Sequence, residues 1–473
     1  MAIVALTLLQ TTAPASDAAD RTGQSPPPLP VRRRFFNRDA PAGLLAAAIA
    51  LHVVAALGFL FALPLYDWPD EPAHLNYVRR LAAGSGFGMM RPDVWHVEEL
   101  ETLKRTHFRD ADSAPARAVI DRLAYEAHQP PLYYLLAAAI YRPTASATAV
   151  KLLNLFLSCV ATVLAWAAAR RLYPDDGRVA VAAAFLLALV PTRCFMAVSV
   201  GNDLLAEVLF GLFVLAVLRG ARPSVVGALI GVGLLAKASA LLALPLYAVW
   251  PARRTGCRDA LSRLAVAAAV ALAVASPWLA RNVLTYGWSD PFALWSGALA
   301  RPAAVPGGSL PHLVWSGPTG VWNFLLVLFA SWWGVFGWMG MLPGRETLGL
   351  YGLLSLAPLA GGAGSLVRTR LHASRADTTS SGADSIEHRA ALRWVALAPL
   401  LVFAGLVLYS LHDFQPQGRY LMVASSCLGV LWAAGSRAAF GRRLTAWIAA
   451  SALALAWANA HAVAHVIPWY LAR

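Results

Sequence analysis

Long apolar runs alternate with short polar segments along almost the whole chain. The first run covers residues 43–63 and the last covers 444–463. Most runs have roughly 18–22 residues, the length at which an α-helix crosses a bilayer. Similar runs lie at 150–169, 179–198, 204–218, 261–279, 348–367, 394–411 and 421–438. The pattern therefore predicts an all-α polytopic membrane protein with about 10–12 membrane helices.

The composition agrees with this prediction. Of the 473 residues, 58% are hydrophobic and 14% are charged, whereas a soluble domain has about 25% charged residues. The net charge is +14, but the arginines form short clusters between apolar runs, where they set membrane orientation. The charge therefore points to a lipid bilayer and not to nucleic acid. The four cysteines are scattered without metal-ligand spacing.

The polar segments predict how the chain is divided. The basic stretch VRRRFFNR precedes the first run, which places the N-terminus in the cytoplasm. Residues 1–42 then form a disordered cytoplasmic arm, and residues 43–473 form the transmembrane domain. Residues 64–148 form a large first external loop, in which AHLNYVRRLAAG and VEELETLKRTHFRDA are helices on the membrane surface. Residues 368–391 form a basic, Ser-rich, disordered cytoplasmic loop.

Some apolar stretches are not simple spans. HQPPLYYLLAAAIYRP has about a dozen apolar residues, too few to cross, so it predicts a half-inserted helix that begins at Pro130 and Pro131. VVGALIGVGLLAKASALLALPLYAVW predicts two short helices that turn around Lys237. WNFLLVLFASWWGVFGWMGMLP fits either a span or a partly inserted element.

An acidic cluster directly follows the first run. In YDWPDEPAH, three carboxylates and a histidine are gathered at the membrane boundary: Asp67, Asp70, Glu71 and His74. A carboxylate there could take the proton of an attacking hydroxyl, and adjacent carboxylates could bind a divalent cation. The alternative is a solvated loop in which an Asp caps the following helix.

Basic residues near the ends of later runs are candidates for binding a phosphate. Lys237 lies inside an apolar stretch, where an ionisable group is expensive and often functional, unless its amine reaches the interface. Arg281 and Arg419 lie at the outer ends of runs, and a guanidinium suits a phosphate or a carboxylate. Arg281 could equally pair with lipid head groups. Gly418 would let a ligand approach the backbone beside Arg419.

The remaining candidates lie on the same side of the membrane. They are His128, Gln129, Asn202, Asp203, Gln417 and Tyr420. For His128 and Gln129 the alternative is an ordinary helix start beside interfacial aromatic rings, and for Asp203 it is a helix N-cap. Together the candidates predict an outward cavity with carboxylates on one side and cations on another, suited to a phosphate-linked sugar donor and a hydroxyl or amine acceptor.

Several of these motifs resemble a known superfamily. DWPDEPAHLNYVRRLAAG resembles the acidic motif in the first external loop of GT-C glycosyltransferases, which include the protein O-mannosyltransferases and the aminoarabinose lipid A transferases. HQPPLYYLL, VGNDLLAEVLFGL, LLAKASALLALP, RNVLTYGWSDP, SWWGVFGWMGMLP and QGRYL are similar to segments of an uncharacterised bacterial family of GT-C-related membrane proteins. The resemblance extends from about Asp67 to Tyr420.

The resemblance implies a GT-C fold, a polyprenyl-phosphate sugar as donor and transfer on the outer face of the membrane. The catalytic aspartate of the family corresponds to Asp70, with Glu71 beside it. The phosphate-binding basic residues correspond to Lys237 and Arg419. The aminoarabinose transferases have a Glu-Lys pair where this chain has His128-Gln129, so the metal or donor contacts of that pair do not carry over.

The first interpretation is therefore an inverting glycosyltransferase of the cytoplasmic membrane, with an envelope glycan, lipid or protein as acceptor. Adjacent carboxylates leave room for a divalent cation, and no other cofactor is expected. The alternatives are a transporter or flippase for a lipid-linked saccharide, which needs no catalytic base, or a non-catalytic envelope-assembly protein. A transporter often shows internal repeats, and none is convincing here.

Overall fold

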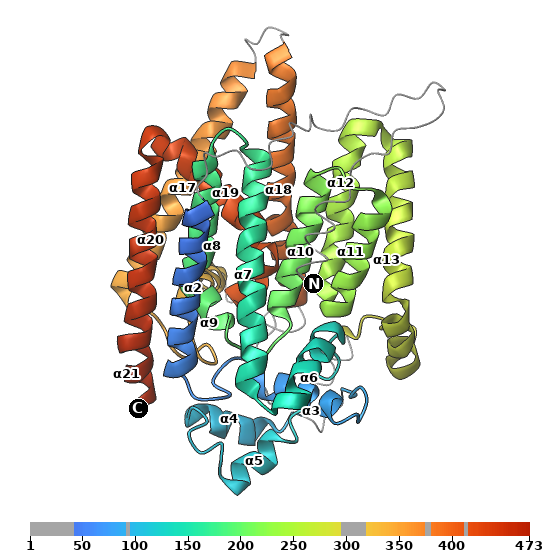
Figure 1. Cartoon of the computed structure of the whole chain (residues 1–473), viewed down its shortest axis with the longest axis vertical. Coiled ribbons are helices and arrows are strands. Elements are labelled where there is room, and N and C mark those ends of the chain that lie inside the picture. Colours follow the sequence, from blue (N-terminus) through green and yellow to red (C-terminus); the bar gives the residue numbers. More distant parts are fainter. Residues whose placement is uncertain (1–41, 91–94, 295–317, 374–379, 411–414) are drawn as a thin grey trace.

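The protein is a bundle of helices with a small helical cap at one end (Figure 1). The computed structural model describes residues 42–90, 95–294, 318–373, 380–410 and 415–473. Within these residues the only β pairing is an isolated bridge between Phe336 and Met341. The all-α prediction is therefore confirmed.

The longer helices form the bundle. They are α2 (Ala42–Ala62), α7 (Ala147–Leu172), α8 (Gly177–Leu189), α10 (Asp203–Leu218), α11 (Pro223–Ala236), α12 (Ala243–Thr255), α13 (Cys257–Tyr286), α16 (Pro318–Gly334), α17 (Arg345–Ala373), α18 (Ser380–Ser410), α19 (Ser425–Phe440) and α20 (Leu444–His461). Short elements join them: α9 (Pro191–Met196), the 3-10 helices η2 (Ala238–Leu242), η3 (Gly418–Ala424) and η4 (Gly441–Arg443), the π-helix η5 (Ala462–Val466) and α21 (Ile467–Leu471).

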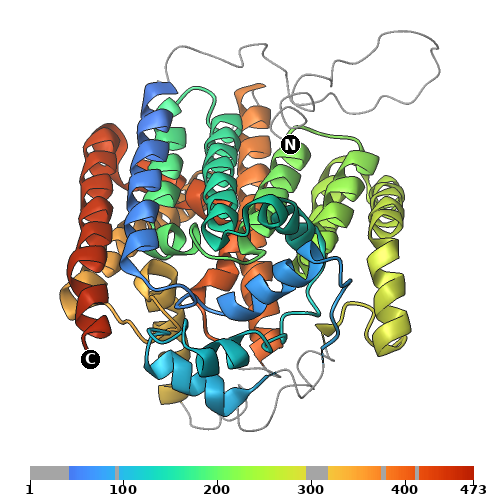
Figure 2. The same cartoon turned by 60° about the horizontal axis from the view of Figure 1, so that its bottom comes forward.

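The cap contains the helices predicted for the first external loop. These are α3 (Glu71–Ala82), α4 (Val97–Arg105) and α5 (Ala114–Ile120), followed by α6 (Leu132–Thr144). Figure 2 shows α3 lying across the ends of the long helices, against α6. The short helix expected after Pro130 and Pro131 is thus confirmed as α6. The two short helices expected around Lys237 are also confirmed, because this residue is extended between α11 and η2.

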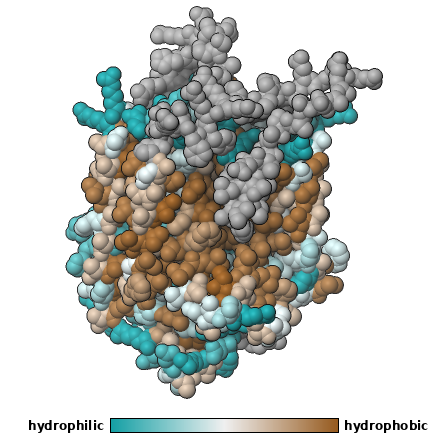
Figure 3. All heavy atoms as spheres, in the orientation of Figure 1, coloured by the Kyte–Doolittle hydropathy of each residue, from teal (hydrophilic) through white to brown (hydrophobic). Residues whose placement is uncertain are grey.

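The bundle carries an apolar belt between two polar ends, visible on the face shown in Figure 3. Six helical segments among the described residues are long and apolar enough to cross a membrane: Ala42–Ala62, Ala147–Leu172, Cys257–Tyr286, Arg345–Ser365, Ile386–Ser410 and Gly418–Leu471. These are fewer than the ten to twelve expected. The difference arises because helices such as α8 and α11, with 13 and 14 residues, lie in the bundle but are short.

Two segments, residues 1–42 and 368–391, were predicted to be disordered. The arm predicted for residues 1–42 lies outside the described residues, except for Ala42, which begins α2. The prediction of a disordered loop at 368–391 is corrected, because α17 continues to Ala373 and α18 begins at Ser380. Residues 374–379 are not described. Arg, Leu and Ala are good helix formers, so α17, which ends in VRTRLHA, extends beyond its apolar part.

An aromatic core fastens the loop between α2 and α3 to the bundle. The ring of Trp68 stacks on Phe195 of α9 at a centroid distance of 5.7 Å, and its Nε1 donates a hydrogen bond to the Phe195 carbonyl oxygen (2.9 Å). Phe59 and Phe336 pack beside them, with ring centroids 5.0 Å apart. On the other side, Trp338 donates from Nε1 to the carbonyl oxygen of Tyr66 (3.0 Å). The loop is therefore held from two directions.

We expect Gly361→Ala to lower the thermal stability of the protein. A Cβ at Gly361 of α17 would meet the carbonyl oxygen of Gly435 and, at 2.7 Å, the backbone nitrogen of Ala439 in α19. Overpacking of this kind costs about 1–3 kcal/mol. Gly362→Ala is the matched control, because its Cβ would meet nothing within 4 Å. Equal melting temperatures for the two purified variants would contradict this account of the α17–α19 contact.

Candidate functional site

Asp70 lies at the start of α3 but does not cap it. Its backbone is left-handed, with φ of 63°, and its side chain makes no capping hydrogen bond. Asp tolerates this conformation better than most residues. The carboxylate instead receives a hydrogen bond from Nη2 of Arg419 at Oδ2 (2.6 Å) and a long one from the Tyr125 hydroxyl at Oδ1 (3.4 Å). The alternative interpretation of Asp70 as a helix cap is therefore excluded.

The Asp70–Arg419 ion pair is only partly shielded from solvent. The side chain of Asp70 is 24% exposed and that of Arg419 is 8% exposed. Burial alone would raise the pKa of Asp70, but the Arg419 guanidinium and, to a smaller extent, His74 hold this pKa below its usual value. Asp70 is consequently an ionised carboxylate with an accessible face.

A second cation lies close to the first. The Lys237 amine forms an ion pair with Asp203, the first residue of α10. It also lies 5.6 Å from the ring centroid of Tyr420, whose other neighbour is the Arg419 guanidinium at 5.1 Å. The structure therefore brings Lys237, Asp203, Arg419 and Tyr420 to one place, as the sequence predicted.

Amide side chains connect this cation site to the start of α6. Nδ2 of Asn202 donates to Oε1 of Gln129 (3.1 Å) and to the carbonyl oxygen of Ala236, next to Lys237 (2.9 Å). Gln129 also contacts Nε2 of His128 (3.4 Å), and Nδ1 of His128 bonds to the carbonyl oxygen of Tyr125 (3.0 Å). Burial lowers the pKa of His128 to about 4, so this histidine is neutral.

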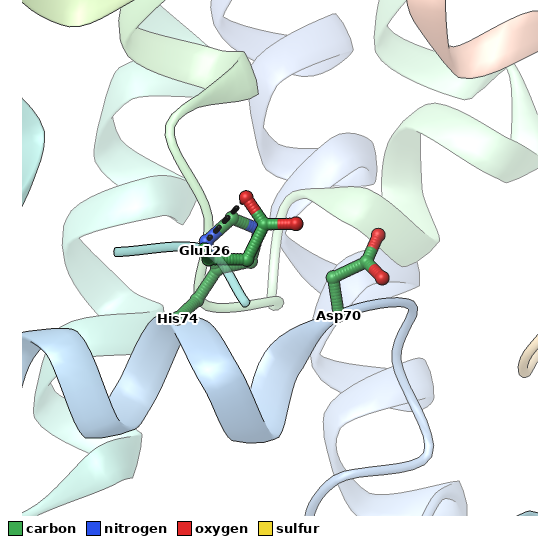
Figure 4. Close-up of side chains that lie close together, drawn as sticks. All are labelled: Asp70, His74 and Glu126. Atoms are coloured by element: carbon green, nitrogen blue, oxygen red, sulfur yellow. Dashed lines mark ion pairs between the residues drawn. The ribbon is translucent and has the colours of Figure 1, made fainter. Parts of the chain in front are cut away.

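Glu126, which lies beside His74, is an acid that the sequence analysis did not identify. Nδ1 of His74 is bonded to the Tyr134 hydroxyl (2.8 Å) and lies 4.0 Å from Oε2 of Glu126. Burial lowers the pKa of His74 and raises that of Glu126. Figure 4 shows Glu126 in contact with His74, and Asp70 standing to one side of them. The signal for Glu126 was its position two residues before His128, in YEAHQPP.

These three side chains could hold a divalent cation. One ligand atom from each of Asp70, His74 and Glu126 lies within 4.8 Å of the others, and a carboxylate–imidazole set suits transition metals. The fit is incomplete in this structure, because Arg419 occupies Oδ2 of Asp70 and Tyr134 occupies Nδ1 of His74. A cation bound through those two atoms would have to replace both hydrogen bonds.

Glu71 points away from this cluster. Its Oε1 is 3.0 Å from Nζ of Lys151 in α7 and accepts from the Val200 backbone, while Oε2 accepts from the backbone of Tyr66. The side chains of Glu71 and Lys151 are 0% and 3% exposed. Asp70 precedes α3 and has a left-handed backbone, so the two adjacent side chains turn toward different surroundings. The structure therefore does not bring the Glu71 carboxylate together with that of Asp70, with which it was expected to act.

Lys151 was not a candidate in the sequence, although the signal was present. It is one of three lysines in the chain, and it lies at the start of an apolar run, as an ionisable group that is expensive to bury. Its amine lies 3.3 Å from the centroid of the Trp68 ring. The same argument that identified Lys237 would have identified Lys151.

Asp67 and Arg281 also lie apart from the cluster. Oδ2 of Asp67 is 3.3 Å from Nδ1 of His107. Arg281 donates to the carbonyl oxygen of Gly88 and to Asn282, and its guanidinium lies 4.8 Å from the centroid of the Trp278 ring. The structure therefore does not bring these two residues, which were expected to bind the donor, into the cluster around Asp70.

Gly418 has a packing role and not the expected role in ligand approach. A Cβ at this position would meet the backbone of Trp332 and Leu328 in α16. The backbone nitrogen of Gly418 donates to Oγ of Ser331 (2.7 Å). Gln417, next to it, lies beside Arg419 in the wall of a small hollow. Glycine is therefore required because η3 packs directly on the α16 backbone.

We expect the stability of the protein to fall as the pH rises through about 7, with Asp67 as a cause. Burial and the Glu71 carboxylate raise the pKa of Asp67 to about 7, against the opposing effect of Lys151. A raised acid pKa stabilises the fold at low pH, and this contribution is lost as the pH rises through the folded-state pKa. Asp67→Asn should therefore raise the melting temperature, relative to wild type, more at pH 8 than at pH 5. An equal effect at both pH values would contradict the assignment.

We expect Glu71→Gln to destabilise the fold strongly, because it leaves Lys151 buried without its charge partner. Removing one partner of such a pair costs about 3–5 kcal/mol. The double change Glu71→Gln with Lys151→Met should recover much of the loss, as measured by thermal unfolding. Asp112→Asn, which removes the exposed pair with Arg117, is the control and should change the melting temperature little. Additive losses in the double variant would show that the pair is not coupled.

Comparisons with known proteins agree with this architecture. Residues 128–280, about a third of the chain, match the family model described as dolichyl-phosphate-mannose-protein mannosyltransferase. The matched range contains Asn202, Asp203 and Lys237 but neither Asp70 nor Arg419. Among curated proteins no significant match was found.

Solved structures provide the second comparison. ArnT from Cupriavidus metallidurans, bound to undecaprenyl phosphate, matches with a TM-score of 0.51 and 17% identity, over 91% of this chain and 74% of ArnT. The archaeal oligosaccharyltransferase AglB from Archaeoglobus fulgidus, in complex with an inhibitory peptide and a dolichol-phosphate, gives a TM-score of 0.46 and 13% identity, over 90% of this chain and 55% of AglB. The chain thus shares the fold of ArnT, and its resemblance to GT-C membrane glycosyltransferases is confirmed at the level of the fold.

Proposed function

We propose that this protein is a membrane glycosyltransferase that moves a sugar from a polyprenyl-phosphate donor to a glycan, lipid or protein acceptor of the cell envelope. The observation that carries the proposal is the ionised Asp70 carboxylate, paired with Arg419 and close to the Lys237 site. A base beside two cations is the arrangement that transfer from a phosphate-linked donor requires. The family model match and the fold likeness to ArnT support it.

Asp70 acts as the general base in this proposal. It accepts the proton of the acceptor hydroxyl or amine, whose lone pair attacks the anomeric carbon of the donor. The bond between that carbon and the phosphate oxygen breaks, and polyprenyl phosphate leaves with the electron pair. A single displacement of this kind inverts the configuration at the anomeric carbon.

Arg419 and Lys237 stabilise the departing phosphate. Both are held near Tyr420, and each is paired with a carboxylate before the donor binds. A phosphate that engages Arg419 weakens its bond to Asp70. Asp70 then loses the cation that keeps its pKa low and becomes a stronger base at the time it is needed.

The remaining residues position these groups. Asp203 orients Lys237, and Asn202 with Gln129 fixes the turn that carries it. Glu71 is a positioning residue for Asp70, because it fastens the start of α3 to Lys151. Asp67 and Arg281 maintain local structure in this proposal and do not touch the donor.

The proposed orientation places the cap and the site on the outer face of the cytoplasmic membrane. The basic segment before α2 favours a cytoplasmic N-terminus, and a single crossing by α2 then brings Asp70 to the outside. The chemistry gathers at the cap end of the bundle, where α3 and α6 meet (Figure 2). This asymmetry favours a transferase over a flippase, which must offer its substrate a polar path to both faces.

We expect Asp70→Asn to abolish transfer while the protein still folds and binds the donor. Loss of a general base costs about 10²–10⁴-fold in rate, and Asn tolerates the left-handed backbone of this position. The measurement is release of polyprenyl phosphate from radiolabelled polyprenyl-phosphate sugars by purified protein in detergent, with and without EDTA. The EDTA arm tests whether a cation at Asp70, His74 and Glu126 contributes.

Arg281→Gln is the control, because this arginine lies outside the cluster and should affect release far less than Asp70→Asn does. Normal turnover by the Asp70 variant would reject Asp70 as the base. Donor binding without turnover by both wild type and variant, with every acceptor, would favour the flippase interpretation.

A further inference from the structure

Two histidines lie one helical turn apart at the end of α20. His461 is the last residue of α20, and His465 lies in the π-helix η5 that follows it. Side chains four positions apart are neighbours on one face of a helix, and the same spacing separates the two zinc-binding histidines of H-E-x-x-H motifs. The two ring centroids are 5.2 Å apart and the ring planes are inclined by 40°.

This separation fits two imidazoles that share one zinc ion. Zn²⁺ binds a histidine nitrogen at about 2.0–2.1 Å, usually with tetrahedral geometry. When roughly 1.1 Å is added for the distance from a ring nitrogen to the ring centre, two such ligands have ring centres about 5 Å apart. The helix backbone therefore already sets the separation that a shared ion requires.

Both rings are accessible and unengaged. His465 is exposed and His461 is half-buried, because the buried residues Ala462 and Ile467 form the side of the helix that faces the bundle. Among the described residues, no hydrogen bond or ion pair involves either ring. An ion could thus bind a nitrogen of each ring without displacing an existing partner.

The local structure holds the pair in line. In an α-helix four residues turn by about 400°, which is 40° more than a full circle. A π-turn has more residues per turn, so the π-turn between His461 and His465 offsets this rotation. The ring of Trp457 stacks on His461 with an interplanar angle of 8° and a centroid distance of 5.0 Å. Single π-turns are rare and often occur at functional sites.

In the proposed orientation the pair lies at the outer boundary of the membrane. α20 begins at Leu444, directly after the basic η4, and a rise of about 1.5 Å per residue places the two histidines roughly 25–30 Å along the helix from there. The hydrocarbon core is about 30 Å thick. Figure 1 shows that α20 leads to the C-terminus at the cap end of the bundle. Ions of the external solution can therefore reach the pair.

We propose that His461 and His465 together bind a divalent transition-metal ion such as Zn²⁺, at a site separate from the Asp70 cluster. One nitrogen of each imidazole is a ligand, and the other two positions of a tetrahedral ion stay open to water. Imidazole suits zinc, copper and nickel, whereas magnesium and calcium prefer oxygen ligands. Because the protein supplies only two ligands, the ion exchanges with the surroundings, unlike the ion of a closed structural zinc site.

The test is chemical modification of the histidines in the purified full-length protein, prepared without a polyhistidine tag and read by mass spectrometry of peptides. Diethylpyrocarbonate acylates a free imidazole nitrogen, and a bound ion blocks this reaction. We expect Zn²⁺ alone to slow modification of His461 and His465 over one shared concentration range, and Mg²⁺ to protect neither. His96 at the start of α4, partly exposed and without a capping hydrogen bond, is the internal control and should react equally fast with and without Zn²⁺.

Two variants test whether the histidines act together. His461→Gln should raise the Zn²⁺ concentration that half-protects His465 by at least about tenfold, because even loss of a group that supports a metal ligand costs about 10–100-fold in affinity. Glu126→Gln changes the other candidate metal site and should leave the protection of both histidines unchanged. Equal modification of His96 in all preparations checks that the variants are folded.

Three outcomes would overturn the inference. The first is an equal modification rate of the pair with and without Zn²⁺. The second is protection of His465 at the same Zn²⁺ concentration in His461→Gln, because one histidine would then suffice. The third is loss of protection in Glu126→Gln, which would place the ion at the Asp70 cluster. None of them bears on the glycosyltransferase proposal, whose test is the release of polyprenyl phosphate.

Discussion

The ion pair between Glu71 and Lys151 fixes the loop on which the candidate site depends. A buried pair of charges is rarely more stabilising than apolar residues of the same size, so its value here is geometric. Glu71 also accepts hydrogen bonds from the backbones of Tyr66 and Val200. It thereby joins the loop after α2 to the segment between α9 and α10. The next residue toward the N-terminus, Asp70, is held in an unusual backbone conformation that directs it at Arg419.

A second buried pair supports the opposite half of the site. Arg193 of α9 contacts Oε1 of Glu207 in α10 through Nε (2.9 Å) and donates to the backbone of α7 through Nη2 (2.5 Å to the Ser158 oxygen). Ser425, which follows η3, donates to the same Glu207 oxygen. Because η3 carries Arg419, the pair of Arg193 and Glu207 anchors Arg419, while the pair of Glu71 and Lys151 anchors Asp70. Asp70 and Arg419, 349 positions apart in sequence, meet because both anchors contact α9 or its neighbours.

The sequence predicted the helical membrane fold and the gathering of Asp70, Lys237 and Arg419, because charged residues at apolar boundaries are costly and therefore conspicuous. It did not predict Glu126 or Glu207, because pairing of this kind depends on which helices are neighbours, and local patterns do not contain that information. The placement of Glu71 was not foreseen for the opposite reason. Adjacency in sequence suggested a shared site, whereas the start of α3 turns Glu71 and Asp70 toward different surroundings.

The shielding of the Asp70–Arg419 pair has a consequence for the medium in which the protein works. Mobile ions weaken the attraction between exposed charges, with a Debye length of about 8 Å at physiological salt concentration, but they act much less on buried charges. With the guanidinium only 8% exposed, counterions cannot surround it. The electrostatic balance between Asp70 and Arg419 is therefore set mainly by the protein and varies little with ionic strength. A membrane protein of this design would keep the same charge balance at this pair in dilute and in salty surroundings.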